Sequence, residues 1–230
     1  MMIRTPAVLR DRRVKAVILS VLDAMTFLLN AYCVLRFFTG TGDGNMQVSG
    51  FAAFRFFTVD SNVLASVACL AVLPHSIRAA RTGELSIPAW VSVFKMIGTT
   101  AVTVTLLTVV FFLGPLYGYP FMFAGNNFFM HLLCPLFCII TFAFLETDAP
   151  VSHKYAFFGA IPTVIYGIVY LLCVVAFGVW GDFYGFNIGG FWYVSFIVMF
   201  FASVGLSYGL FSLHNLAARR APAHTALDKK

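Results

Sequence analysis

The sequence has little charge and no long polar segment. Only 10% of its 230 residues are charged, against about 25% in a typical soluble domain. At about 20 residues per membrane span, a chain of this length has room for about six or seven spans and little else, which excludes a separate soluble catalytic domain. Hydrophobic residues instead make up 60% of the chain, and its mean hydropathy is +0.90. The composition indicates an integral membrane protein.

No cysteine lies in a loop between the apolar runs, where it could form an extracellular disulfide. All five cysteines fall within apolar runs, which argues against an extracellular disulfide framework and against a zinc cluster. They are Cys33, Cys69, Cys134, Cys138 and Cys173. His131 is the one histidine inside the predicted membrane, and it has no His, Asp or Glu three or four residues away. We therefore expect no metal site and no cofactor.

Six apolar stretches approach or exceed the length that crosses a bilayer, which is about 20 residues. They cover residues 14–38, 51–73, 89–113, 128–145, 155–179 and 191–213. Turn-forming segments such as Pro74–Pro88 separate them. The sequence predicts an all-α fold, a polytopic bundle of six transmembrane helices in a single integral membrane domain over residues 1–230. The first stretch is too long for a cleaved signal peptide and is expected to remain as a span.

Lys and Arg gather on one side of the predicted bilayer. They occur in the N-terminal segment, the second and fourth connections and the tail, but not within the first, third and fifth loops. The positive-inside rule then predicts that both termini are cytoplasmic. The net charge of +6 is explained by this topology, so we expect no nucleic-acid partner.

Several polar side chains interrupt the apolar spans, where each is costly unless it is paired or hydrated. Helical periodicity places those of each span on a shared face. These residues are Asp23 and Asn30 in the first span, Arg55, Thr58, Ser61 and Asn62 in the second, Asn127, His131 and Cys134 in the fourth, and Tyr166 in the fifth. We expect the faces to converge on one polar pocket.

Thr58 and His131 have the parts of an activated nucleophile. The second and fourth helices enter from the same side, so the two residues lie at a similar depth. A threonine hydroxyl needs a base within hydrogen-bond reach, and Asn62 or Asn127 would donate to a developing oxyanion. The plainer alternative is that Thr58 bonds to its own helix or joins two helices, and that His131 is a structural partner.

Three other features keep different functions open. Lys95 lies near the cytoplasmic end of the third span, where it either snorkels or pairs with Asp23. Asp23, Lys95 and Asp60 would be the functional charges of a non-catalytic transporter or carrier. A structural membrane subunit would instead use a small-residue face such as the one containing Gly205 and Gly209, and a homo-oligomer is possible.

Two segments resemble a known family. They are Phe54-Arg-Phe-Phe-Thr-Val-Asp-Ser-Asn-Val-Leu64 and Asn127-Phe-Phe-Met-His-Leu-Leu-Cys-Pro135, which resemble the androgen-induced protein family and its bacterial six-span relatives. The resemblance implies six spans with cytoplasmic termini and a bacterial plasma-membrane location. It also implies hydrolysis of fatty acid esters of hydroxy fatty acids by an intramembrane threonine and a histidine, which match Thr58 and His131. At residues 183–186 the chain departs from a Tyr-Pro pair that relatives tend to show.

The leading hypothesis is therefore an intramembrane lipid ester hydrolase that acts on a membrane lipid or fatty acyl ester. Thr58 is the expected nucleophile and His131 the expected base. The supporting or oxyanion residues are Asn62, Asn127, Ser61 and Arg55, and the pocket residues are Asp23, Asn30, Tyr166 and Cys134.

Overall fold

The computed structural model describes residues 11–39 and 48–220. Across these residues the chain is helical and contains no strand. Six helices are long and apolar enough to cross a membrane: Arg12–Thr39, Phe57–Thr82, Ala89–Tyr117, Asn126–Leu145, His153–Ala176 and Trp192–Arg220. The predicted all-α fold with six spanning helices is confirmed, and the chain is an integral multi-pass membrane protein.

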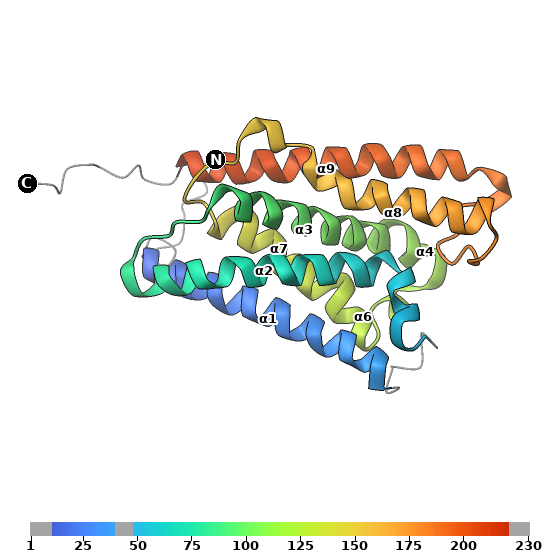
Figure 1. Ribbon diagram of the computed structural model, residues 1–230, viewed down its shortest axis with the longest axis horizontal. Coiled ribbons are helices and arrows are strands. Elements are labelled where there is room, and N and C mark those ends of the chain that lie inside the picture. The colour runs from blue at the N-terminus through green and yellow to red at the C-terminus, as the bar shows by residue number, and fades with distance from the viewer. Residues whose placement is uncertain (1–10, 40–47, 221–230) are drawn as a thin grey trace, which may run out of the picture.

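The helices lie side by side in an elongated bundle (Figure 1). The longest α-helical segments of the six spans are α1 (Arg12–Thr39), α2 (Phe57–Thr82), α3 (Ala89–Thr108), α7 (Cys134–Ile140), α8 (Ile161–Leu171) and α9 (Trp192–Arg220). In the third span, 67% of an 18-residue apolar stretch is buried inside the bundle. The corresponding share is 22% in the fifth and sixth spans. The third span is therefore the central helix, and it packs against the second, fourth, fifth and sixth spans.

Short helical segments complete or connect the spans. The 3₁₀ segments are η2 (Gly50–Arg55), η6 (His153–Tyr155), η7 (Phe158–Ala160) and η9 (Ile188–Gly190). The π-helical segments are η3 (Val109–Leu113), η4 (Phe129–Leu133), η5 (Thr141–Leu145) and η8 (Leu172–Ala176). The short α-helices are α4 (Gly114–Tyr117), α5 (Tyr119–Met122) and α6 (Asn126–Phe128).

The two ends of the bundle differ in character. At one end of the bundle, on the left in Figure 1, α1 begins and both α2 and α9 end. We call it the basic end, because Arg81 lies in the last turn of α2 and Arg219 and Arg220 lie in the last turn of α9. The opposite end carries η2 and residues 177–191, and we call it the aromatic end. Basic residues at positions 1–10 and 221–230 lie outside the described residues. The assignment of the basic end to the cytoplasm stays a prediction.

The second span differs from the predicted 51–73 at both of its ends. Phe56 is extended, with φ −99° and ψ 126°, so Gly50–Arg55 forms a separate 3₁₀ turn before α2 begins at Phe57. α2 then continues through Pro74 to Thr82, because a proline removes one main-chain hydrogen bond while the packed helix keeps the others. It ends at Gly83, whose φ of +84° suits glycine and whose N–H bonds to Ala79.

Small residues allow the central helix to approach its neighbours closely. A Cβ atom added to Gly98 of α3 would lie 2.9 Å from the Cα atom of Ala65 on α2. A Cβ atom on Gly159 of η7 would overlap the hydroxyl of Thr100 on α3. By contrast, Gly205 and Gly209 lie on an exposed face of α9.

Candidate functional site

Thr58 and His131 meet inside the bundle, toward its aromatic end. The Oγ1 atom of Thr58 lies 3.3 Å from the Nε2 atom of His131, at the long end of hydrogen-bond distances, as is common for a nucleophile and its base in the absence of substrate. Both side chains are buried, with exposed fractions of 8% and 2%. Thr58 is in the first turn of α2 and His131 is in the π-helical turn η4, so the pair joins the second and fourth spans.

The contact made by the second ring nitrogen of His131, Nδ1, determines which of the two ring nitrogens carries the proton. Nδ1 lies 2.7 Å from the carbonyl oxygen of Met122, which can only accept a hydrogen bond. In the neutral ring, Nδ1 therefore carries the hydrogen and Nε2 presents its lone pair to the hydroxyl of Thr58. This arrangement of a hydroxyl, a base and a group that orients the base is the geometry of an activated nucleophile.

The π-helical turn explains how His131 reaches α2. In η4 the amide of Cys134 bonds to the carbonyl of Phe129, five residues back, and the carbonyl of Met130 is released from the usual bond of an α-helix. Pro135, the next residue, has no N–H to donate. The side-chain amide of Asn62 occupies the released carbonyl at 2.9 Å, which ties η4 to α2.

Asn62 is therefore placed differently from the oxyanion donor expected from the sequence. Its Nδ2 atom donates to the carbonyls of both Thr58, at 2.8 Å, and Met130, at 2.9 Å. Both amide hydrogens are used in these bonds. In this arrangement Asn62 positions the two helical segments, α2 and η4, that carry the candidate nucleophile and base.

Asn127 and Arg55 also lie away from the expected positions. The Nδ2 atom of Asn127 is 3.5 Å from the carbonyl of Phe121, in the turn before the fourth span. Arg55 belongs to η2 and does not share a face of α2 with Thr58, because the chain bends at Phe56. Its guanidinium instead lies over the rings of Phe56 and Phe183, at 5.0 and 5.6 Å.

Ser61 and Tyr166 support the first turn of α2. The hydroxyl of Ser61 lies 2.9 Å from the hydroxyl of Thr105 on α3 and 3.2 Å from the carbonyl of Thr58. Tyr166 of α8 donates to the carbonyl of Arg55 at 2.6 Å. These contacts fix the start of α2 from two sides.

The remaining predicted pocket residues do not all join this site. Asn30 donates to the hydroxyl of Ser66 at 2.8 Å and joins α1 to α2. Cys134 is fully buried on α7. Asp23 pairs with Lys95 at 2.5 Å, so the pairing alternative accounts for Lys95 better than snorkelling does. The polar faces therefore form more than one group, and the expectation of a single polar pocket is wrong.

Tyr184 is a site residue that the sequence does not reveal. Its hydroxyl accepts the N–H of Phe57 at 2.8 Å, directly beside Thr58. Asp182 holds this loop, because its carboxylate accepts from Tyr170 and from the amides of Phe186 and Asn187 at 2.7–2.9 Å. Burial raises the pKa of Tyr184 to about 12, so its hydroxyl stays protonated at neutral pH.

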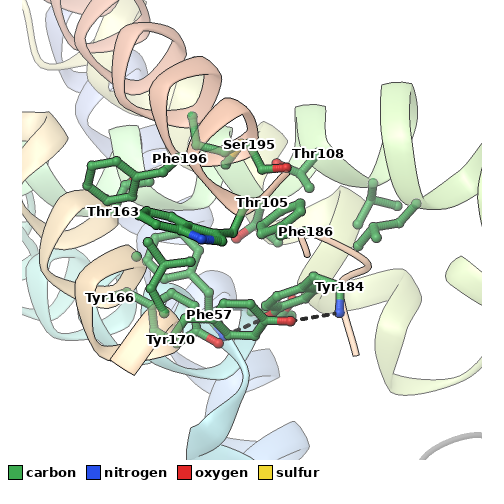
Figure 2. A pocket seen from close by; sticks show the side chains of 17 residues that line it. Phe57, Thr105, Thr108, Thr163, Tyr166, Tyr170, Tyr184, Phe186, Ser195 and Phe196 are labelled. Carbon is green, nitrogen blue, oxygen red and sulfur yellow. Dashed lines mark hydrogen bonds between the residues drawn. The ribbon is translucent and has the colours of Figure 1, made fainter. Parts of the chain in front are cut away.

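Thr58 lines an apolar pocket with a volume of about 60 Å³. Its other lining residues include Phe57, Thr105, Tyr166, Tyr184 and Phe196. Figure 2 shows the rings of Phe196 and Tyr166 on one side of this pocket and those of Phe186 and Tyr184 on the other. The sequence pattern could not identify this lining, because it combines α2, α3, α8, α9 and the loop 177–191.

A larger groove adjoins this pocket. It lies along α3 and α9, has a volume of about 640 Å³ and is lined mostly by apolar side chains. The residues shared by the pocket and the groove are Thr108, Phe186, Ser195 and Met199. Exposed residues such as Phe111 and Phe201 form its outer part. The groove thus leads from the lipid-facing surface of the bundle toward Thr58.

Within residues 11–39 and 48–220, no group of three or more His, Cys, Asp or Glu side chains could hold a metal ion. Comparison of the chain with protein-family models, curated proteins and solved structures finds no match.

Proposed function

We propose that the protein is an intramembrane lipid ester hydrolase in which Thr58 is the nucleophile and His131 the general base. The observation that carries the proposal is the 3.3 Å contact between Thr58 Oγ1 and His131 Nε2. The orientation of the imidazole by the Met122 carbonyl supports it, because it leaves the unprotonated nitrogen beside the hydroxyl. The resemblance to the androgen-induced protein family points to the same two residues.

In the first half of the reaction, Nε2 of His131 takes the proton as Thr58 Oγ1 bonds to the ester carbonyl carbon. The tetrahedral intermediate then breaks the bond to the leaving alkoxide, which receives the proton from Nε2. In the second half, His131 removes a proton from water, the water oxygen attacks the acyl-threonine carbonyl, and the proton returns to Oγ1. The products are a carboxylic acid and an alcohol.

Tyr184 is the donor best placed to stabilise the oxyanion. It lines the same pocket as Thr58, and its hydroxyl oxygen already accepts the N–H of Phe57. A hydroxyl can accept and donate at once, so its hydrogen is able to turn toward a developing negative charge. The high pKa of Tyr184 keeps that hydrogen in place. This role replaces the one first expected for Asn62 and Asn127.

The substrate class follows from the walls of the pocket and the groove. The aromatic and aliphatic side chains of the lining suit an acyl chain, and Thr58, Thr105 and Thr108 add hydroxyl groups to it. An acyl chain entering from the bilayer along α3 and α9 would reach the pocket through the four residues that the two share. We therefore propose a membrane lipid or fatty acyl ester as substrate.

A fluorophosphonate probe, which reacts with activated hydroxyl groups, tests the proposal on the purified full-length protein. The unmodified protein and Thr58→Ser are expected to be labelled, whereas Thr58→Ala and His131→Ala are not. Thr26→Ala and His153→Ala are matched controls, because Thr26 bonds to its own helix and His153 is exposed. Folded protein that remains unlabelled, or equal labelling of Thr58→Ala, would contradict the proposal.

Transport is a second candidate function, favoured by one observation. Asp23 and Lys95 form a fully buried ion pair, and charges at membrane depth commonly mark an ion or substrate path. Asp60 lines another cavity between α2 and α8, which shares Phe57 and Tyr166 with the Thr58 pocket. Loss of substrate uptake in Asp23→Asn, together with normal behaviour of Thr58→Ala, would favour a transporter over a hydrolase.

A further inference from the structure

A cluster of three charged side chains is buried near the basic end of the bundle, apart from Thr58. Lys95 of α3 lies between Asp23 of α1 and Glu146, the residue after η5. Its Nζ atom is 2.5 Å from Asp23 Oδ1 and 3.3 Å from Glu146 Oε1. All three side chains are fully buried.

The formal charges of this cluster do not balance. Two carboxyl groups face one ammonium group, so full ionisation would leave one negative charge in the interior. The adjacent side chain from α2 is the thiol of Cys69, 3.0 Å from Lys95 Nζ, and Cys138 of α7 lies 3.9 Å from Cys69. Neither thiol supplies positive charge.

The other polar groups at the basic end are bonded to partners other than Glu146. Asp148 is exposed and acidic, and its carboxylate accepts the N–H of Ile87. The ammonium of Lys15 on α1 donates to the hydroxyl of Thr147 at 2.6 Å. On α9, the two ring nitrogens of His214 face the carbonyls of Phe142 and Ala149.

The buried carboxylate oxygens of the cluster show where the excess negative charge must be neutralised. Oδ2 of Asp23 and both Oε atoms of Glu146 are buried without a hydrogen-bond partner among the described residues. An isolated carboxylate in an apolar interior is so unfavourable that it normally takes up a proton. Asp23 has the short, charge-assisted bond to Lys95, whereas the contact of Glu146 with Lys95 lacks hydrogen-bond geometry. Glu146 is therefore the group that needs the proton.

We propose that Asp23, Lys95 and Glu146 form a proton-binding site, in which Glu146 carries one exchangeable proton while Asp23 and Lys95 remain an ion pair. Glu146 is two residues from the exposed Asp148, so the proton exchanges with the basic end of the bundle. The site shares no residue with the Thr58 pocket, and its existence does not depend on the proposed hydrolase activity.

The titration of Glu146 has a defined direction. Burial raises the pKa of Glu146 to about 8, and the neighbouring ammonium of Lys95 opposes this rise. The folded protein then binds one more proton than the unfolded chain between the ordinary glutamate value of 4.5 and about pH 8. Stability must therefore fall as the pH rises through this interval.

Infrared difference spectroscopy of the full-length protein in detergent tests the site at pH 6. The spectrum of the unmodified protein minus that of Glu146→Gln is expected to contain one protonated-carboxyl C=O band that shifts in D₂O. Asp148→Asn is the matched control and should leave this band unchanged. A difference spectrum that contains only ionised-carboxylate bands would overturn the proposal.

Lys95→Met provides a second test, which counts the protonated carboxyl groups of the cluster whichever of the two acids carries the proton. Without the ammonium, Asp23 must also become neutral, so a second protonated-carboxyl band is expected. An unchanged number of bands would contradict the proposed charge balance. A Glu146 band seen only in sodium-free buffer would also overturn it, by showing that a monovalent cation occupies the site instead.

Discussion

The side-chain amide of Asn62 donates to the main-chain carbonyl of Met130 at 2.9 Å. The same amide bonds to the carbonyl of Thr58, so one side chain holds the residue that carries the hydroxyl and the residue that precedes His131. The contact depends on the π-helical turn, which releases the Met130 carbonyl. The geometry of the candidate nucleophile thus rests on a bond between two helices.

Replacement of Asn62 by alanine is expected to slow ester hydrolysis by about 10–100-fold, because small displacements of reacting groups are costly. Both reacting side chains remain, so the residual activity should still depend on Thr58. The measurement is kcat for Asn62→Ala with and without Thr58→Ala. If Asn62→Ala lowers the residual activity of Thr58→Ala by the same factor as it lowers that of the unmodified protein, Asn62 does not act by positioning Thr58. Asn127→Ala is the matched control, and its activity should be near normal.

Tyr184→Phe is expected to lower kcat about 100-fold if the hydroxyl donates to the oxyanion. The aromatic ring is kept, so the pocket retains its shape and the KM should change little. Steady-state kinetics at neutral pH provides the measurement, and Tyr193→Phe is a control at an exposed position. Equal kcat values for Tyr184→Phe and the unmodified protein would remove Tyr184 from the mechanism.

Ser195→Trp is expected to narrow the passage between the groove and the pocket. Hydrolysis of a long-chain ester should fall about tenfold in kcat/KM, the equivalent of roughly 1.4 kcal/mol, whereas a short-chain ester should be less affected. Ile197→Trp lies on the same helix at an exposed position and is the control. An equal loss for both esters would indicate general damage to the fold rather than a blocked acyl path.

Lys95→Ala is expected to lower the free energy of unfolding by about 3–5 kcal/mol, because it leaves Asp23 buried without its partner. The double variant Asp23→Asn with Lys95→Met should recover part of this loss. Unfolding in detergent, followed by circular dichroism, measures the effect. Lys154→Ala removes a basic residue from an exposed position and should change stability little. A loss no larger than that of Lys154→Ala would show that the pair contributes nothing to the fold.

Much of the fold was predictable because membrane spans depend on the length and composition of local segments. The beginning of α2 was not, since the break at Phe56 is set by distant contacts such as that between Tyr166 and Arg55. The continuation through Pro74 was missed for a related reason. Packing against neighbouring helices outweighs the local effect of one proline.

The pairing of Thr58 with His131 was accessible from topology, because both lie near the start of helices that enter from the same side. The roles of Asn62 and Tyr184 were not accessible. The amide of Asn62 is directed by the released carbonyl of Met130, and Tyr184 is brought to α2 by a loop more than a hundred residues away in the chain. Only the three-dimensional packing shows which polar groups are already bonded.

The most direct test of the central claim is peptide mapping by mass spectrometry after reaction of the full-length protein with the fluorophosphonate probe. We expect the adduct on the peptide that contains Thr58, with fragment ions that assign it to this residue, and we expect its loss in His131→Ala. An adduct on another hydroxyl, or an equal yield on Thr58 in His131→Ala, would contradict the account.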